Sequence, residues 1–164
     1  MLRDIYYDLP NADRHYFLLQ LEFDENDQKW ELFLDILKTP DKNDSYYDIL
    51  AIEVLKILKL SDIPPSYIEQ LLAIYIGILK SGSDDDIRNY TIMSSVNFIN
   101  INKELKDTII EILFNEDEFI VLRENSYFSI LELNSKTEKM ELLSKLVSDK
   151  ELSEYAKNDI LGIS

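Results

Sequence analysis

Apolar residues recur at helical spacing along most of this chain. Over residues 26–38, Trp30, Phe33, Leu34 and Leu37 stand at positions i, i+3, i+4 and i+7, which places all four on one face of a helix. The same spacing predicts further helices over 13–22, 44–60, 64–80, 84–99, 102–114, 117–133, 135–147 and 149–163. The pattern therefore predicts an all-α fold.

Short polar turns separate the predicted helices, and three of these turns are acidic, at residues 81–86, 115–118 and 148–149. Turns this short favour helices that pack as antiparallel neighbours. Two turns also hold a serine followed three residues later by a glutamate, at Ser135 and Ser148. That spacing is the pattern of a helix capping box, so we expect helices to begin at both serines.

The helices repeat in pairs. The first helices of successive pairs begin near Asn26, Pro64, Asn102 and Ser135, about 33 to 38 residues apart. The second helices carry a small or short side chain at matching places, namely Ala51, Thr91, Ser126 and Ala156. Paired helices of this repeat length are typical of solenoids, because one helical hairpin alone cannot bury both of its faces.

We therefore predict a single domain over residues 1–164. Residues 1–25 form an N-terminal arm and cap helix, and residues 26–163 form about four antiparallel helical hairpins stacked as a short α-solenoid. An irregular helical bundle is the alternative arrangement.

Two of the predicted second helices share a motif, in which an acidic turn leads to an apolar residue, an arginine and then a small residue. The copies run from Asp86 through Arg88 to Thr91, and from Val121 through Arg123 to Ser126. This motif resembles HEAT-like repeats, and the copy that ends at Ala156 lacks the arginine. The resemblance implies that turn acids, here Asp86 and Asp117, and the helix arginines support each other from one repeat to the next. It implies no particular activity.

Composition narrows the class of partner. The formal net charge is −15, a field that repels nucleic acid phosphates and anionic lipid and attracts basic proteins. There are no cysteines, which excludes disulfides and thiolate metal sites. We expect neither a membrane-spanning helix nor a secretory signal peptide in this sequence. We therefore expect a cytoplasmic protein, and one that is a monomer when no partner is bound.

No catalytic set is evident. The single histidine, His15, lies outside the regular repeats, and the chain has neither a Gly-x-Ser-x-Gly elbow nor a glycine-rich phosphate loop. We expect no enzyme activity and no cofactor. A divalent metal held by the three aspartates 84–86 is the basis of the least favoured alternative, a carboxylate-based metal-dependent hydrolase.

Two acidic turns hold more charge than helix capping needs. One carboxylate per turn caps free N–H groups and meets the positive end of the helix dipole. Residues 84–86 and 116–118 instead hold three acids each, which predicts an acidic ridge if the hairpins stack in register.

These features favour a non-catalytic protein-binding module. At the level of type, the chain resembles small acidic bacterial immunity proteins, which implies that it occludes a basic toxin such as a nuclease. A HEAT-like scaffold or adaptor subunit is the alternative. The expected contact residues lie in the acidic turns and on the solvent side of the second helices: Tyr46, Tyr47, Asp84, Asp85, Asp86, Asn89, Tyr90, Glu116, Asp117, Glu118, Glu124 and Asn125.

Overall fold

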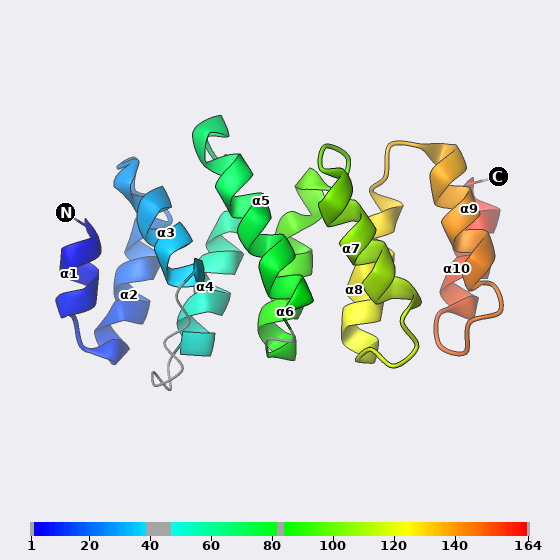
Figure 1. Cartoon of the computed structure of the whole chain (residues 1–164), viewed down its shortest axis with the longest axis horizontal. Coiled ribbons are helices and arrows are strands. Elements are labelled where there is room, and N and C mark those ends of the chain that lie inside the picture. The colour runs from blue at the N-terminus through cyan, green and yellow to red at the C-terminus, as the bar shows by residue number, and fades with distance from the viewer. Residues whose placement is uncertain (1, 39–46, 82–83, 164) are drawn as a thin grey trace. The chain divides into compact units, whose positions relative to one another are not determined.

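The computed structural model describes residues 2–38, 47–81 and 84–163, and within these ranges the protein is all helical (Figure 1). The prediction of an all-α fold is confirmed. The described residues form ten α-helices and one short 3₁₀-helix, and no strand. The elements are α1 (Leu2–Asp8), α2 (Asn11–Leu21), α3 (Gln28–Lys38), α4 (Tyr47–Leu60), α5 (Pro65–Lys80), α6 (Asp85–Ser95), η1 (Val96–Phe98), α7 (Lys103–Phe114), α8 (Ile120–Leu131), α9 (Lys136–Leu146) and α10 (Ser153–Ile163).

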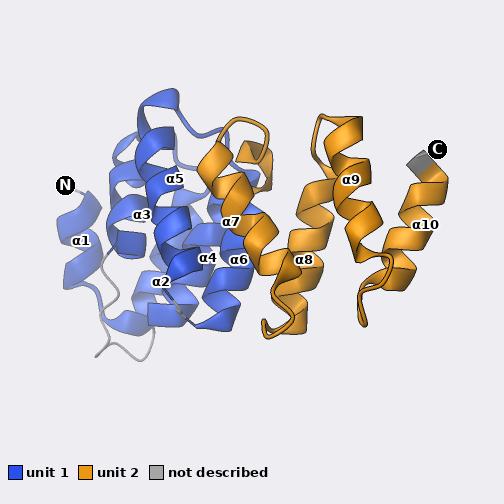
Figure 2. Ribbon diagram, turned by 45° about the vertical axis from the view of Figure 1, so that its right-hand side comes forward, with its two compact units in different colours: residues 1–95 blue, residues 96–164 orange. Residues whose placement is uncertain are grey.

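The chain divides into two compact units, residues 1–95 and residues 96–164 (Figure 2). Unit 1 contains α1 to α6, and unit 2 contains η1 and α7 to α10. The single domain over residues 1–164 stays a prediction.

Unit 1 is built from two rows of helices. α4 packs between α2 and α6 in one row, and α3 packs between α1 and α5 in the other. Across the rows, α1 packs on α2, α3 on α4 and α5 on α6. α4 has neighbours on several sides, and its Ala51, Val54 and Leu55 are 0% exposed. The Ser94 hydroxyl of α6 lies 2.6 Å from the carbonyl oxygen of Leu55, a close approach that a short side chain permits.

Unit 2 contains two helix pairs, α7 with α8 and α9 with α10. Polar contacts join one pair to the other. The Lys106 ammonium of α7 binds the Glu138 carboxylate of α9 at 2.6 Å, and Asn100 accepts a hydrogen bond from the Asn134 N–H at 2.8 Å. Leu105, Ile109, Leu122, Leu143 and Leu152 are among the fully buried core residues.

The four small residues that define the repeat are all core residues. Ala51, Thr91, Ser126 and Ala156 are each 0% exposed. The first helices of the pairs begin at Gln28, Pro65, Lys103 and Lys136, close to the predicted starts. The repeat found in the sequence therefore corresponds to a repeat of buried positions.

The N-terminal segment differs from the expected arm, because residues 2–8 form α1. The cause is a tertiary contact that periodicity does not reveal. The Arg14 guanidinium donates to the carbonyl oxygens of Tyr6 at 3.2 Å, Leu9 at 3.1 Å and Tyr7 at 2.9 Å. These carbonyls lie at the end of α1, where the regular series of helical N–H donors stops. The Tyr6 carbonyl also accepts from the Leu9 N–H at 3.2 Å. The Tyr6 ring is also 1% exposed.

Two predicted boundaries also move. The helix expected over 84–99 ends at Ser95, where the Ser94 and Ser95 hydroxyls lie 2.7 and 3.0 Å from carbonyls of their own helix. Such bonds compete with regular helix formation. Ser135 does cap α9, since its hydroxyl accepts from the Glu138 N–H at 3.2 Å, but α10 begins at Ser153 rather than near Ser148.

Arg14→Ala should destabilise α1 locally. The substitution leaves three carbonyl oxygens without their guanidinium partner, a loss of about 1–3 kcal/mol. Hydrogen exchange measured by mass spectrometry should show faster exchange in residues 2–9 and unchanged exchange in α7 to α10. Unchanged protection of residues 2–9 would show that α1 forms without Arg14.

Candidate functional site

The three aspartates of the acidic turn in unit 1, Asp84 to Asp86, have different roles. The Asp84 carboxylate accepts from the N–H groups of Asp86 at 2.9 Å and Ile87 at 3.4 Å, so it caps the start of α6. Asp85 binds the Arg88 guanidinium at 3.3 Å. All three aspartates are exposed. Asp86 is the carboxylate that capping does not explain.

The acidic turn of unit 2 is closed by an asparagine. The Asn115 side chain accepts from the Asp117 N–H at 3.2 Å, and the Glu118 carboxylate accepts from the Phe119 N–H at 3.2 Å. Glu116 and Asp117 are exposed. Their carboxylates are therefore presented to solvent by a turn that other atoms hold in place.

The two motif arginines have different environments. Arg88 is 8% exposed and pairs with Asp85 of its own helix. Arg123 is 1% exposed, and its Nε donates to the Leu113 carbonyl oxygen at 3.1 Å.

The other two nitrogens of Arg123 reach the turn between α9 and α10. Nη1 binds the Glu151 carboxylate at 2.6 Å, and Nη2 binds Asp149. Asp149, rather than the exposed Asp117, is thus the turn acid that supports this arginine. The guanidinium fork satisfies both carboxylates and a backbone carbonyl, which is the condition for a buried cation.

The hydrogen bonds and the ion pair of Asp149 also explain the shift in the pKa of its carboxyl group. Burial opposes ionisation, but the N–H groups of Leu152 and Glu151 and the Arg123 guanidinium together lower the pKa of Asp149 below its ordinary 3.8. Its Oδ1 accepts those two N–H bonds at 3.0 and 2.9 Å. The predicted capping box at Ser148 is therefore wrong, because Asp149 closes the turn and Glu151 pairs with Arg123.

The remaining predicted contact residues are mostly half-buried. Tyr90 lies beneath the Lys56 ammonium, 5.4 Å from ring centre to nitrogen, and Asn89 precedes it on α6. On α8, Glu124 is half-buried, and Asn125 donates to the Val121 carbonyl oxygen at 3.1 Å.

Tyr46 and Tyr47 were also predicted contacts, and Tyr47 is the first residue of α4. Burial and the neighbouring Asp48 charge raise the pKa of Tyr47 above its ordinary value. Tyr46 lies outside the described residues. The structure places Asp84–Asp86, Asn89, Tyr90 and Tyr47 in unit 1, and Glu116–Glu118, Glu124 and Asn125 in unit 2.

Unit 2 also holds an aromatic cluster that sequence reasoning missed. Tyr127 and Phe128 of α8 and Tyr155 of α10 have ring centroids 5.8 to 6.2 Å apart in all three pairings. Tyr127 is buried, whereas Phe128 and Tyr155 are 51% and 43% exposed. The sequence offered one indication of this cluster: Phe128 stands four residues after the expected contact residue Glu124, and residues at that spacing share a helix face.

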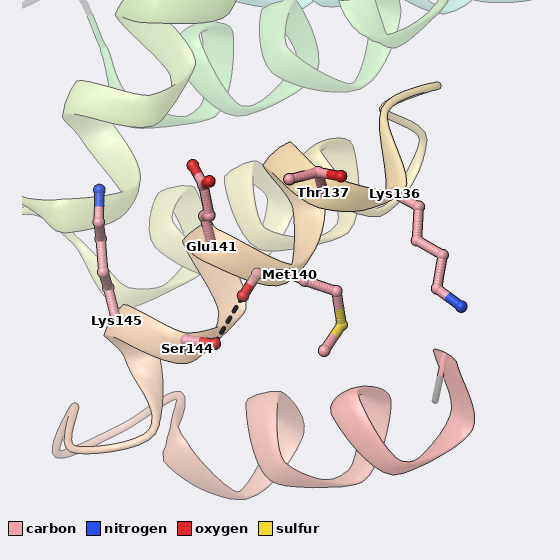
Figure 3. Close-up of a pocket in the computed structure, with 6 residues that line it drawn as sticks. All are labelled: Lys136, Thr137, Met140, Glu141, Ser144 and Lys145. Atoms are coloured by element: carbon pink, nitrogen blue, oxygen red, sulfur yellow. Dashed lines mark hydrogen bonds between the residues drawn. The ribbon is translucent and has the colours of Figure 1, made fainter.

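A shallow open depression of about 620 Å³ follows one face of α9 (Figure 3). Its lining residues all belong to that helix: Lys136, Thr137, Met140, Glu141, Ser144 and Lys145. The Ser144 hydroxyl donates to the Met140 carbonyl oxygen at 2.7 Å. Residues 96–164 contain no histidine, so no imidazole base of unit 2 adjoins this serine.

Among residues 2–38, 47–81 and 84–163, no three histidine or acidic side chains converge as a metal site would require. In the same ranges, no helix has the length and apolar character needed to cross a membrane. No known protein family, curated protein sequence or solved structure matches this chain.

Arg123→Met should strongly destabilise unit 2. It leaves Asp149, whose side chain is 8% exposed, without its cation, and removing one partner of a buried pair costs about 3–5 kcal/mol. The measurement is the free energy of unfolding in urea, with hydrogen exchange to locate the loss in α8 and α10. The matched control is Arg3→Met, because Arg3 pairs with Asp35 but is 60% exposed, and we expect less than about 1 kcal/mol there. Equal losses in both variants would contradict this account.

The Asp149 carboxylate should make unit 2 sensitive to acid. Its pKa is lower in the folded chain, so its contribution is complete above the unfolded pKa and is lost as the pH falls through the folded pKa, below 3.8. Wild type and Asp149→Asn should therefore differ most in unfolding free energy near pH 7. The difference should shrink as the pH falls below about 4. A difference independent of pH between 7 and 3 would refute the assignment.

Proposed function

We propose that this chain is a non-catalytic binding module for a basic protein. The observation that carries the proposal is the excess of solvent-exposed carboxylates at two turns, in a chain whose net charge is −15. Asp86, Glu116 and Asp117 are exposed, and other groups make the helix-capping bonds nearby. Exposed charge of one sign steers oppositely charged proteins and raises their association rate.

We further propose that the helices form a HEAT-like stack of hairpins. Three features support this arrangement: the two helix rows of unit 1, the polar links between helix pairs in unit 2, and the buried Arg123 beside the following acidic turn. Such stacks use an extended surface for binding rather than a deep pocket.

The biological role we favour is that of an immunity protein that covers a basic toxin, such as a nuclease. The small size, the negative charge and the exposed tyrosines suit occlusion of a cationic surface, and the charge disfavours nucleic acid and anionic membrane as partners. The test is co-expression with a basic protein that alone arrests growth, for which a neighbouring gene is the first candidate. Restored growth supports neutralisation, whereas binding without rescue indicates an adaptor.

Neutralising the excess carboxylates should slow association. Asp86→Asn, Glu116→Gln and Asp117→Asn together leave the capping groups Asp84 and Asn115 in place. The association rate constant with the basic partner should fall about tenfold at low salt, and the effect should shrink near 0.15 M salt because ions screen exposed charges. Surface plasmon resonance over a salt series measures both.

The matched control removes the same amount of charge elsewhere, at three exposed acids outside both turns: Asp8→Asn, Glu25→Gln and Glu31→Gln. If the two triple variants slow association equally, net charge rather than the acidic turns attracts the partner. If neither variant has an effect at low salt, the acidic turns are only a solvated surface.

A further inference from the structure

Unit 2 exposes two aromatic rings side by side. Phe128 of α8 and Tyr155 of α10 are 51% and 43% exposed, with ring centroids 6.2 Å apart and planes at 70°. Single exposed apolar side chains are common on protein surfaces. Two adjacent rings contributed by different helices are less easily explained by chance exposure.

A buried third ring supports the pair. Tyr127 is 1% exposed, and its ring centroid lies 5.8 Å from both Phe128 and Tyr155. The Tyr127 hydroxyl donates to the Asp159 carboxylate of α10, and burial and this acceptor raise the pKa of Tyr127. The bond joins α8 to α10, the two helices that carry the exposed rings. A supported aromatic pair loses little conformational entropy on binding, which suits an interface anchor.

The surroundings of the pair are acidic. On a helix, residues three and four positions apart are surface neighbours. Within the two helices, those positions hold Glu124, Asn125 and Leu131 around Phe128 and Asn158 and Asp159 around Tyr155, and no lysine or arginine. Glu124 and Asp159 therefore contribute negative charge near the rings.

We infer that Phe128 and Tyr155 form an anchor for an arginine side chain of the basic partner. A guanidinium is planar and weakly hydrated, so it stacks on an aromatic face while its N–H groups reach nearby carboxylates. Lysine is a compact, strongly hydrated charge and gains less from such a surface. The inference rests on the proposed function, since it specifies how a basic protein is held.

Charge complementarity selects this occupant over others. A purely apolar segment would desolvate the carboxylates without a compensating cation. A second copy of this chain also has a net charge of −15, so it would be repelled by this negative surface. Nucleic acid bases stack on aromatic rings, but their phosphates would meet the negative field.

The test compares octa-arginine and octa-lysine as probes. Binding to the full chain is measured by isothermal titration calorimetry at about 0.15 M salt, where long-range attraction is screened. Octa-arginine should bind more tightly, and the NMR resonances of the Phe128 and Tyr155 rings should shift. Phe128→Leu and Tyr155→Leu keep apolar volume but remove the π faces. Each should weaken octa-arginine binding about two- to fivefold and leave octa-lysine binding nearly unchanged.

Phe23→Leu is the matched control, because Phe23 is 82% exposed and belongs to unit 1. Circular dichroism verifies that each variant is folded. If both peptides bind equally and the leucine variants do not change their affinity, the arginine anchor is overturned. The proposal of a basic protein partner is then still supported. Absence of binding to either peptide overturns both. A dimer in sedimentation that Phe128→Leu disrupts overturns the anchor and assigns the surface to a second copy.

Discussion

A helix of this chain cannot cover its apolar surface with one neighbour, and this constraint organises the structure. α4 buries Leu50, Ala51, Val54, Leu55, Ile57 and Leu58, which together span far more than one narrow stripe. In unit 1 that surface is covered by α2 and α6 within its row and by α3 across it. Burial of this kind is non-directional, and it requires that each helix pack against several others. It does not determine their spacing, which depends on shape and on polar contacts.

Polar contacts supply that spacing in unit 2. Arg123 joins α8 to the turn before α10, Tyr127 joins α8 to α10, and Lys106 joins α7 to α9. Each contact links residues 26 to 32 positions apart in the sequence. A hydrogen bond requires a narrow range of distance and angle, so these groups specify which helix faces meet. This role explains the burial of the Arg123 guanidinium.

The sequence predicted what depends on local spacing and missed what depends on distant partners. The stripe that includes Trp30 and Phe33 predicted α3 because core faces repeat at helical period, and both residues are buried. α1 was missed because Arg14, a later residue, satisfies its terminal carbonyls. The start of α10 was misplaced because Arg123 engages Glu151, which the capping pattern assigned to Ser148.

The candidate contact residues of each unit follow the same division between local pattern and distant partner. The acidic turns could be found because charge is visible in the sequence, although the separation of Asp84 as a cap from Asp86 as excess required the hydrogen bonds. The pairing of Phe128 with Tyr155 could not be found, since the two rings lie on different helices and meet only when the helices pack. The two features act at different ranges. Exposed carboxylates act over about 8–10 Å in solution and favour encounter, whereas stacked rings act only at contact and favour residence. A surface that combines them would gain both rate and lifetime, and neither contribution requires a reacting group.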